Sequence, residues 1–165
     1  MVIIIGLGSN LPGRDGAPPL KTLKLALARL SDCGVEVIAV SPFYKSEPVP
    51  KSDQPWFVNA VAQIETELGP EDLLTRLHEV EEVFGRARRI RNQARILDLD
   101  LLDYQGQVTP NPRAGPVLPH PRMQQRRFVL KPLADLAPEW RHPVLGKSAK
   151  ELLDEVSEEC QIVLL

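Results

Sequence analysis

The chain has 165 residues, of which 43% are hydrophobic and 25% are charged, and its formal net charge at pH 7 is −2. This length suits one domain with a substantial core, so we expect residues 1–165 to form a single domain. The nearly balanced charge argues against nucleic acid or an anionic membrane as a partner, and it implies that any charge cluster has a local role.

The N-terminal residues predict a buried strand. Val2–Leu7 is apolar and rich in β-branched residues, and it lacks the basic start of a signal peptide. No apolar stretch of the sequence is long enough to span a bilayer. Cys33 and Cys160 have neither metal-binding nor redox spacing. We therefore interpret them as reduced thiols and expect a cytoplasmic protein.

The segment Gly6-Leu7-Gly8-Ser9-Asn10 begins like a dinucleotide-binding fingerprint. The third glycine of that motif is missing and no helix begins directly after it. A turn out of the strand, permitted by glycine, is therefore the favoured interpretation. Leucines at helical spacing then predict a helix over 20–30 that stops at Gly34, followed by a strand over 35–40 and a proline-rich loop over 41–54.

Residues 56–66 predict a strand with two different faces. The apolar face comprises Trp56, Val58, Ala60, Ala62 and Ile64. The opposite face carries Phe57 and Asn59, which suit a flat heterocycle such as guanine or a pterin, because an aromatic ring stacks on it while a carboxamide bonds to its edge. The alternative is that Phe57 belongs to the core and Asn59 bonds to backbone, and this pattern alone favours that alternative.

A second helix is predicted after Gly69-Pro70, with acidic residues in its first turn and Gly85 at its end. The arginine-rich segment 86–95 leads from it into an apolar strand over 97–102. That strand carries Asp98 and Asp100, whose side chains point to the same face because strand residues alternate.

The aspartate pair and the arginines together indicate a phosphate site. Two carboxylates side by side repel each other, and a bound Mg²⁺ would relieve that repulsion. Planar arginine forks match phosphate groups. We therefore favour phosphoryl-type transfer from a nucleotide, without a Walker loop, which the sequence lacks. The alternatives are a solvated strand end for the aspartates and a basic loop that contacts solvent or the acidic helix face.

The C-terminal third predicts a proline-rich loop over 105–121, short helices within 122–136 and 147–156, and a closing strand over 161–165. His120, between two prolines, is either a phosphate or nucleotide contact or a loop residue without a role. The order strand, helix, strand, strand, helix, strand predicts an α+β, ferredoxin-like split βαβ fold. In that fold we expect helices packed on one face of a mainly antiparallel sheet.

The sequence resembles the 6-hydroxymethyl-7,8-dihydropterin pyrophosphokinase family of folate biosynthesis over nearly its whole length. The similarity is carried, in this order, by Gly6–Leu11, Ser41–Tyr44, Asp53–Ala60, Phe84–Arg86, Arg95–Asp100, Pro119–Met123 and Arg126–Pro132. The resemblance implies transfer of pyrophosphate from ATP to the hydroxymethyl oxygen of the pterin, with release of AMP.

The resemblance also implies roles for single residues. Asp98 and Asp100 would hold two Mg²⁺ ions. Phe57 and Phe128 would enclose the pterin, with Asn59 at its edge. The residues expected to complete the pterin pocket are Ser46, Pro48 and Val49. Those expected to face ATP are His78, Glu81, Arg86, Arg88, Arg95, His120 and Arg126, and of these Arg86 and Arg95 would join the aspartates in catalysis. The segment 86–93 is expected to order over MgATP.

In-line attack at the β-phosphorus requires positioning and charge stabilisation more than covalent chemistry. The proton acceptor stays open between Asp100 and a metal-bound hydroxide. Two alternative functions also stay open. One is a non-catalytic pterin- or nucleotide-binding relative of the same fold, and the other is a two-metal phosphohydrolase, for which the sequence lacks a metal-binding histidine pair. We expect a monomer whose partners are small molecules rather than nucleic acid or membrane.

Overall fold

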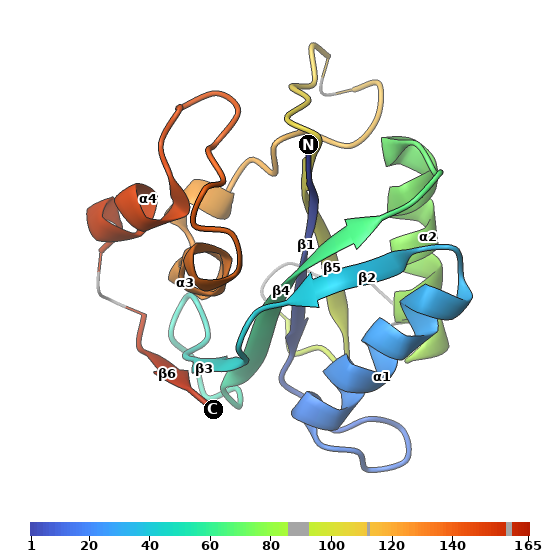
Figure 1. The fold of residues 1–165 in the computed structure, drawn as a ribbon. Helices are drawn as coiled ribbons and strands as arrows, with labels where there is room; N and C mark the ends of the chain where they lie inside the picture. Colours follow the sequence, from blue (N-terminus) through green and yellow to red (C-terminus); the bar gives the residue numbers. More distant parts are fainter. Residues whose placement is uncertain (86–92, 112, 158–159) are drawn as a thin grey trace.

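The computed structural model describes residues 1–85, 93–111, 113–157 and 160–165 (Figure 1). The strands are β1 (Ile3–Ser9), β2 (Glu36–Val40), β3 (Tyr44–Ser46), β4 (Phe57–Glu65), β5 (Asp98–Tyr104) and β6 (Ile162–Leu164). The helices are α1 (Pro19–Asp32), α2 (Pro70–Val83), α3 (Arg127–Leu136) and α4 (Ala149–Glu155), with a short 3₁₀ helix, η1 (Met123–Gln125), before α3.

The strands form a sheet in the order β5-β1-β4-β3-β6, and β2 also pairs with β4. All these pairings are antiparallel. The units β1–α1–β2 and β4–α2–β5 are interleaved, because β4 lies beside β1 and also pairs with β2. This is the split βαβ arrangement, and the predicted α+β, ferredoxin-like fold is confirmed.

The helices α1 and α2 follow the predicted boundaries closely. Each has proline in its first turn, where the missing N–H has no intrahelical partner to lose. Gly34 and Gly85 follow the two helix ends with φ values of 80° and 105°. Only glycine adopts this left-handed conformation without a steric penalty, which explains why each helix stops there.

The sheet has a hydrophobic core on each face. On one face, α1 and α2 cover Ile3, Ile5 and Leu7 of β1. On the other, α3 and α4 cover a second core that contains Ile4, Leu102 and Trp140. Figure 1 shows α3 and α4 on the opposite side of the sheet from α1 and α2. The prediction that helices cover a single face was therefore wrong, because alternate residues of β1 are apolar on both sides.

Three local predictions also need correction. β3 lies inside the segment that was predicted to be a loop. Trp56 precedes β4 and is 38% exposed, so it does not belong to the apolar face of that strand. Gly6 and Gly8 lie within β1 rather than in a turn after it.

Within the described ranges, no helix is long and apolar enough to cross a membrane. Cys33 and Cys160 are free thiols and each is partly buried.

Candidate active site

The strand register brings the two predicted halves of the site side by side. Gly8 of β1 lies opposite Asn59 of β4 on one side and opposite Asp98 of β5 on the other. Gly6 occupies the next row, opposite Asp100 on the β5 side. This row lies on the sheet face that α3 and α4 cover around Ile4. At Gly6 and Gly8 the same face is open.

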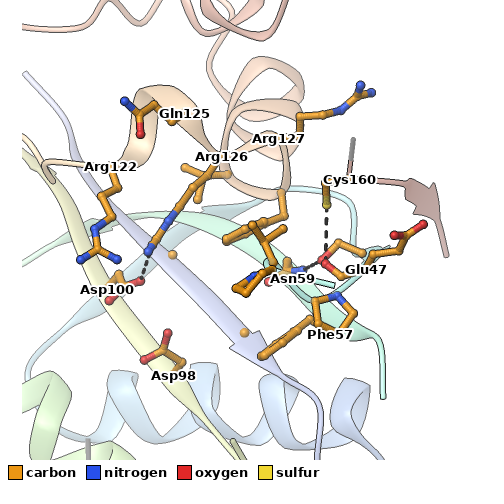
Figure 2. A pocket seen from close by; sticks show the side chains of 18 of the residues that line it. Glu47, Phe57, Asn59, Asp98, Asp100, Arg122, Gln125, Arg126, Arg127 and Cys160 are labelled. Atoms are coloured by element: carbon orange, nitrogen blue, oxygen red, sulfur yellow. Dashed lines mark hydrogen bonds and ion pairs between the residues drawn. The ribbon is translucent and has the colours of Figure 1, made fainter. Parts of the chain in front are cut away.

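A cavity of about 900 Å³ lies over this open part of the sheet. Its lining comes from β1, β4, the segment after β3, the start of β5, the η1–α3 region and the residues around Cys160. The predicted site residues that line it are Ser46, Pro48, Val49, Phe57, Asn59, Arg95, Asp98, Asp100, Arg126 and Phe128. Residues far apart in the sequence therefore meet in one place, as Figure 2 shows for the labelled ones.

One half of the cavity combines aromatic rings with a fixed amide. Asn59 is 5% exposed, and its Nδ2 donates a hydrogen bond to Oγ of Ser46 at 2.6 Å. Phe57, two residues earlier on β4, is on the same strand face as Asn59. Phe128 enters from the first turn of α3. This half can hold a flat heterocycle and bond to its edge.

The other half of the cavity is charged. Nη1 of Arg95 lies 2.8 Å from Oδ2 of Asp98, and Nη1 of Arg126 lies 3.8 Å from Oδ2 of Asp100. The guanidinium of Arg126 also lies 5.6 Å from the centre of the Phe128 ring. Arg126 therefore connects the carboxylates to the aromatic half, because it contacts both.

Asn10 fixes the position of Arg95. Its backbone N–H donates to the Arg95 carbonyl at 2.9 Å, and its Oδ1 accepts from the Arg95 N–H at 2.7 Å. Its Nδ2 donates to the carbonyl of Pro55 at 3.0 Å, just before β4. This buried amide thus ties the segment before β5 to the segment before β4. The sequence contained Asn10 within a recognised motif but gave no sign of this role.

The ionisation of Asp100 is affected by its surroundings in the site. Burial, followed by the negative charge of Asp98, raises the pKa of Asp100 to about 7, and Arg126 opposes the shift. A cation bound between the carboxylates would relieve the same repulsion.

The carboxylate oxygens fit Mg²⁺, which prefers hard oxygen ligands. Among the residues that the structure describes, no group of three or more His, Cys, Asp or Glu side chains gathers as a metal cage. Mg²⁺ bound to nucleotides commonly takes one or two carboxylates and completes its shell with phosphate oxygens and water. The donor set therefore fits magnesium that arrives with a polyphosphate.

Three predicted nucleotide contacts do not line the cavity. Glu81 is 1% exposed, and its Oε1 accepts a hydrogen bond from the backbone N–H of Leu99 at 2.8 Å, so it supports the aspartate strand from behind. Nδ1 of His120 accepts from the Arg122 N–H at 3.2 Å, and burial lowers the pKa of His120 to about 4. His78 lies on α2 and is partly buried. The roles of these three in binding ATP stay predictions.

The sequence prediction missed several lining residues and included two that the structure does not describe. Arg122 and Gln125 extend the polar wall near the aspartates, as Figure 2 shows, and Arg127 lies on the other side, near Cys160. Glu47, Ser157 and Cys160 also line the cavity. The density of basic residues around Arg126 was the available signal for the first group. Arg86 and Arg88, with most of the predicted segment over ATP, lie outside the described residues, whereas Gln93 lines the cavity.

The sequence comparisons with known proteins agree on one family. The sequence model of one family, 7,8-dihydro-6-hydroxymethylpterin-pyrophosphokinase (HPPK), matches residues 4–138. The chain is 44% identical to the 2-amino-4-hydroxy-6-hydroxymethyldihydropteridine pyrophosphokinase of Pseudomonas aeruginosa, over 92% of this chain and 89% of that protein. It is 42% identical to the enzyme of the same name from Haemophilus influenzae, over 81% of this chain and 79% of that protein.

Other similar proteins are longer. The chain is 36% identical to the folic acid synthesis protein fol1 of Pneumocystis carinii, and it spans only 20% of that protein. A crystal structure of Plasmodium falciparum HPPK-DHPS matches the fold with a TM-score of 0.72 at 15% identity, over 93% of this chain and 44% of the other. At that identity the match supports the fold alone.

Proposed function

The chain belongs to the 7,8-dihydro-6-hydroxymethylpterin-pyrophosphokinase (HPPK) family, whose reaction moves pyrophosphate from ATP to hydroxymethyldihydropterin in folate synthesis, and from this premise we propose that the cavity in Figure 2 is where the transfer takes place. The observation that carries the proposal is the row in which Asn59, Gly8 and Asp98 lie on three adjacent strands. That row joins a site for a heterocycle to a site for charged phosphates.

The aromatic half would bind the pterin. Phe57 and Phe128 would contact the two faces of the ring, and Asn59 would bond to its amide edge. The hydrogen bond from Asn59 to Ser46 orients the carboxamide before substrate arrives. Pro48 and Val49 would close the end of the pocket with backbone and apolar contacts.

The charged half would bind the phosphates of ATP. Asp98 and Asp100 would hold two Mg²⁺ ions, and Arg95 and Arg126 would contact phosphate oxygens. The ions, when bound, supply charge neutralisation for the β- and γ-phosphates. Arg86 and Arg88 are proposed to add further phosphate contacts.

The chain's own residues contribute mainly positioning. The ring pocket aims the hydroxymethyl oxygen toward the aspartate row, in line with the β-phosphorus and opposite the departing AMP. Arg95 and Arg126 stabilise charge that develops on the phosphate oxygens in the transition state. The apolar walls from Phe57 and Phe128 restrict water, which limits hydrolysis of ATP.

The direct test incubates the protein with ATP, Mg²⁺ and 6-hydroxymethyl-7,8-dihydropterin. We expect AMP and the pterin diphosphate to form in equal amounts, and we expect no AMP when the pterin is omitted. Pterin binding without AMP formation would instead support the non-catalytic relative. Release of inorganic phosphate without pterin would support the phosphohydrolase.

A second test separates the two halves of the site. Asp98→Ala should abolish turnover, because a ligand for Mg²⁺ is lost, while pterin affinity stays unchanged because the aromatic half is intact. Turnover is measured as AMP release and pterin affinity by fluorescence titration. Loss of both in the same variant would show that Asp98 is needed for structure.

We also propose that the chain works as a cytoplasmic monomer of a single domain that comprises residues 1–165. Both halves of the proposed site are formed by described residues of a single chain, which is the feature that favours a monomer. A monomeric mass in sedimentation, at concentrations where the protein turns over, is the expected result.

A further inference from the structure

Gly8 lies between the two halves of the proposed site. It is opposite Asn59 and opposite Asp98 in the sheet, and residues opposite each other direct their side chains to the same face. Asn59 and Asp98 are two strand spacings apart, which is about 10 Å. This is about the span of a pterin ring with its hydroxymethyl arm, so the arm must pass over Gly8.

The backbone at Gly8 does not require glycine. Gly8 lies inside β1, and it is not among the glycines with positive φ. Glycine in a strand interior weakens the strand, and it often marks a place where a ligand or another backbone approaches closely. Glycine at this position is therefore explained by the space above the strand rather than by the backbone conformation.

A side chain on Gly8 would enter the site. A Cβ built there lies 3.1 Å from Oδ1 of Asn59 and 3.9 Å from Cδ1 of Phe57. Asn59 would have to shift by a few tenths of an ångström, and its bond to Ser46 resists that shift. A Cβ on Gly6, two residues away on the same face, would have the Leu102 side chain as its nearest neighbour, at an ordinary 3.4 Å.

We propose that Gly8 determines specificity in this site by the absence of a side chain. The bare backbone lets the substrate lie across β1 with its ring at Asn59 and its hydroxymethyl group at the aspartate row. A larger residue would displace the Asn59 carboxamide and obstruct the passage, while the phosphate half would keep its geometry. This inference rests on the proposed function, because it takes a pterin as the ligand of the aromatic half.

The test compares Gly8→Ala with Gly6→Ala, which adds the same methyl group to the same strand face. Binding of 6-hydroxymethylpterin is followed by its fluorescence, and binding of a non-hydrolysable ATP analogue with Mg²⁺ is measured separately. We expect Gly8→Ala to raise the pterin dissociation constant about tenfold or more, which corresponds to the loss of one well-made hydrogen bond. Gly6→Ala, whose methyl group would meet Leu102 rather than Asn59, should raise the pterin dissociation constant much less than Gly8→Ala does. The nucleotide affinity of Gly8→Ala should change by less than about twofold.

Each of the other outcomes would overturn either this inference or a named part of the proposed function. Unchanged pterin affinity in Gly8→Ala would overturn this inference alone. Equal losses of pterin and nucleotide affinity, or failure of Gly8→Ala to fold while Gly6→Ala folds, would show a structural role for Gly8 and would also overturn it. Absence of pterin binding by the unaltered protein would overturn the proposed function itself, and absence of AMP formation despite normal pterin binding would overturn only its catalytic part.

Discussion

Asp98 and Asp100 are adjacent carboxylates on one sheet face, and each has an arginine beside it. Arg95 approaches Asp98 at 2.8 Å, whereas Arg126 remains 3.8 Å from Asp100. Asp100 is therefore the less well compensated of the two, which agrees with the direction of its pKa. At the scale of single residues, the site therefore contains a carboxylate that a bound cation would stabilise.

Removing that charge should stabilise the protein in the absence of metal. The pKa of Asp100 is raised in the folded state, so its contribution to stability is largest when it is protonated and is lost as the pH rises through about 7. Asp100→Asn should therefore increase the free energy of unfolding at pH 8 by about 1 kcal/mol, a discounted value because 32% of the side chain is exposed. Urea unfolding of both proteins in the presence of a chelator measures this difference in the free energy of unfolding.

The same experiment at pH 5 provides the control. Asp100 of the unaltered protein is mostly protonated in the folded state there, so the gain from Asp100→Asn should shrink. An equal gain at pH 5 and pH 8 would show that charge repulsion is not its cause.

At the scale of elements, α2 supports β5 through the Glu81 carboxylate as well as through apolar packing. β5 is at the edge of the sheet, and Glu81 accepts the N–H of Leu99, the residue between the two aspartates. The sequence correctly predicted the helix after Gly69-Pro70, but helical spacing does not reveal which backbone group a buried glutamate meets. The assignment of Glu81 to the nucleotide came from the family resemblance.

Substitutions of Glu81 can separate these two roles. Glu81→Gln keeps a hydrogen-bond acceptor for Leu99, so both stability and affinity for an ATP analogue should stay close to those of the unaltered protein. Glu81→Ala leaves a buried N–H without its acceptor, and we expect a loss of about 1–3 kcal/mol in the free energy of unfolding. A Glu81→Gln protein of normal stability that binds the analogue weakly would restore the nucleotide role.

The elements that the sequence predicted best are those with a strong hydrophobic periodicity. The alternation from Val58 to Ile64 and the leucine spacing of α1 both give the observed element. β3 was missed because it has only three residues and lies between Pro42 and Pro48, where proline suggests a loop. The sequence did not predict that α3 packs on the second face of the sheet. Hydrophobic periodicity shows which residues are buried, but it does not show which element covers them.

At the scale of the whole molecule, both ends of the chain contribute to the cavity. Gly6 and Gly8 come from the first strand, while Ser157 and Cys160 come from the last part of the chain. β6 pairs with β3, and β3 holds Ser46, the partner of Asn59. A local motif predicted the aspartate half, and the family resemblance predicted the aromatic half. The closure by β6 depends on strand pairing over a long distance and has no local signature.

The pairing of β6 with β3 should therefore affect pterin binding. The backbone of Gln161 and Leu165 bonds to the β3 segment, so the N–H of Val163, midway between them, also faces β3. Val163→Pro removes that donor and should weaken pterin binding severalfold, with nucleotide affinity unchanged. Val163→Thr keeps the N–H and serves as the control, since this side chain is 53% exposed. Equal pterin affinity in both variants would show that β6 does not position the pocket.

The row of Asn59, Gly8 and Asp98 also affects how the protein is made. Gly8 must pair both with β4 and with β5, which lies still further along the chain, so the site depends on contacts of high sequence separation. Phe128 and Arg126 are synthesised later again. A nascent chain on the ribosome therefore exposes its strands before it holds either substrate, and capacity to split ATP arises only when the full sheet has closed.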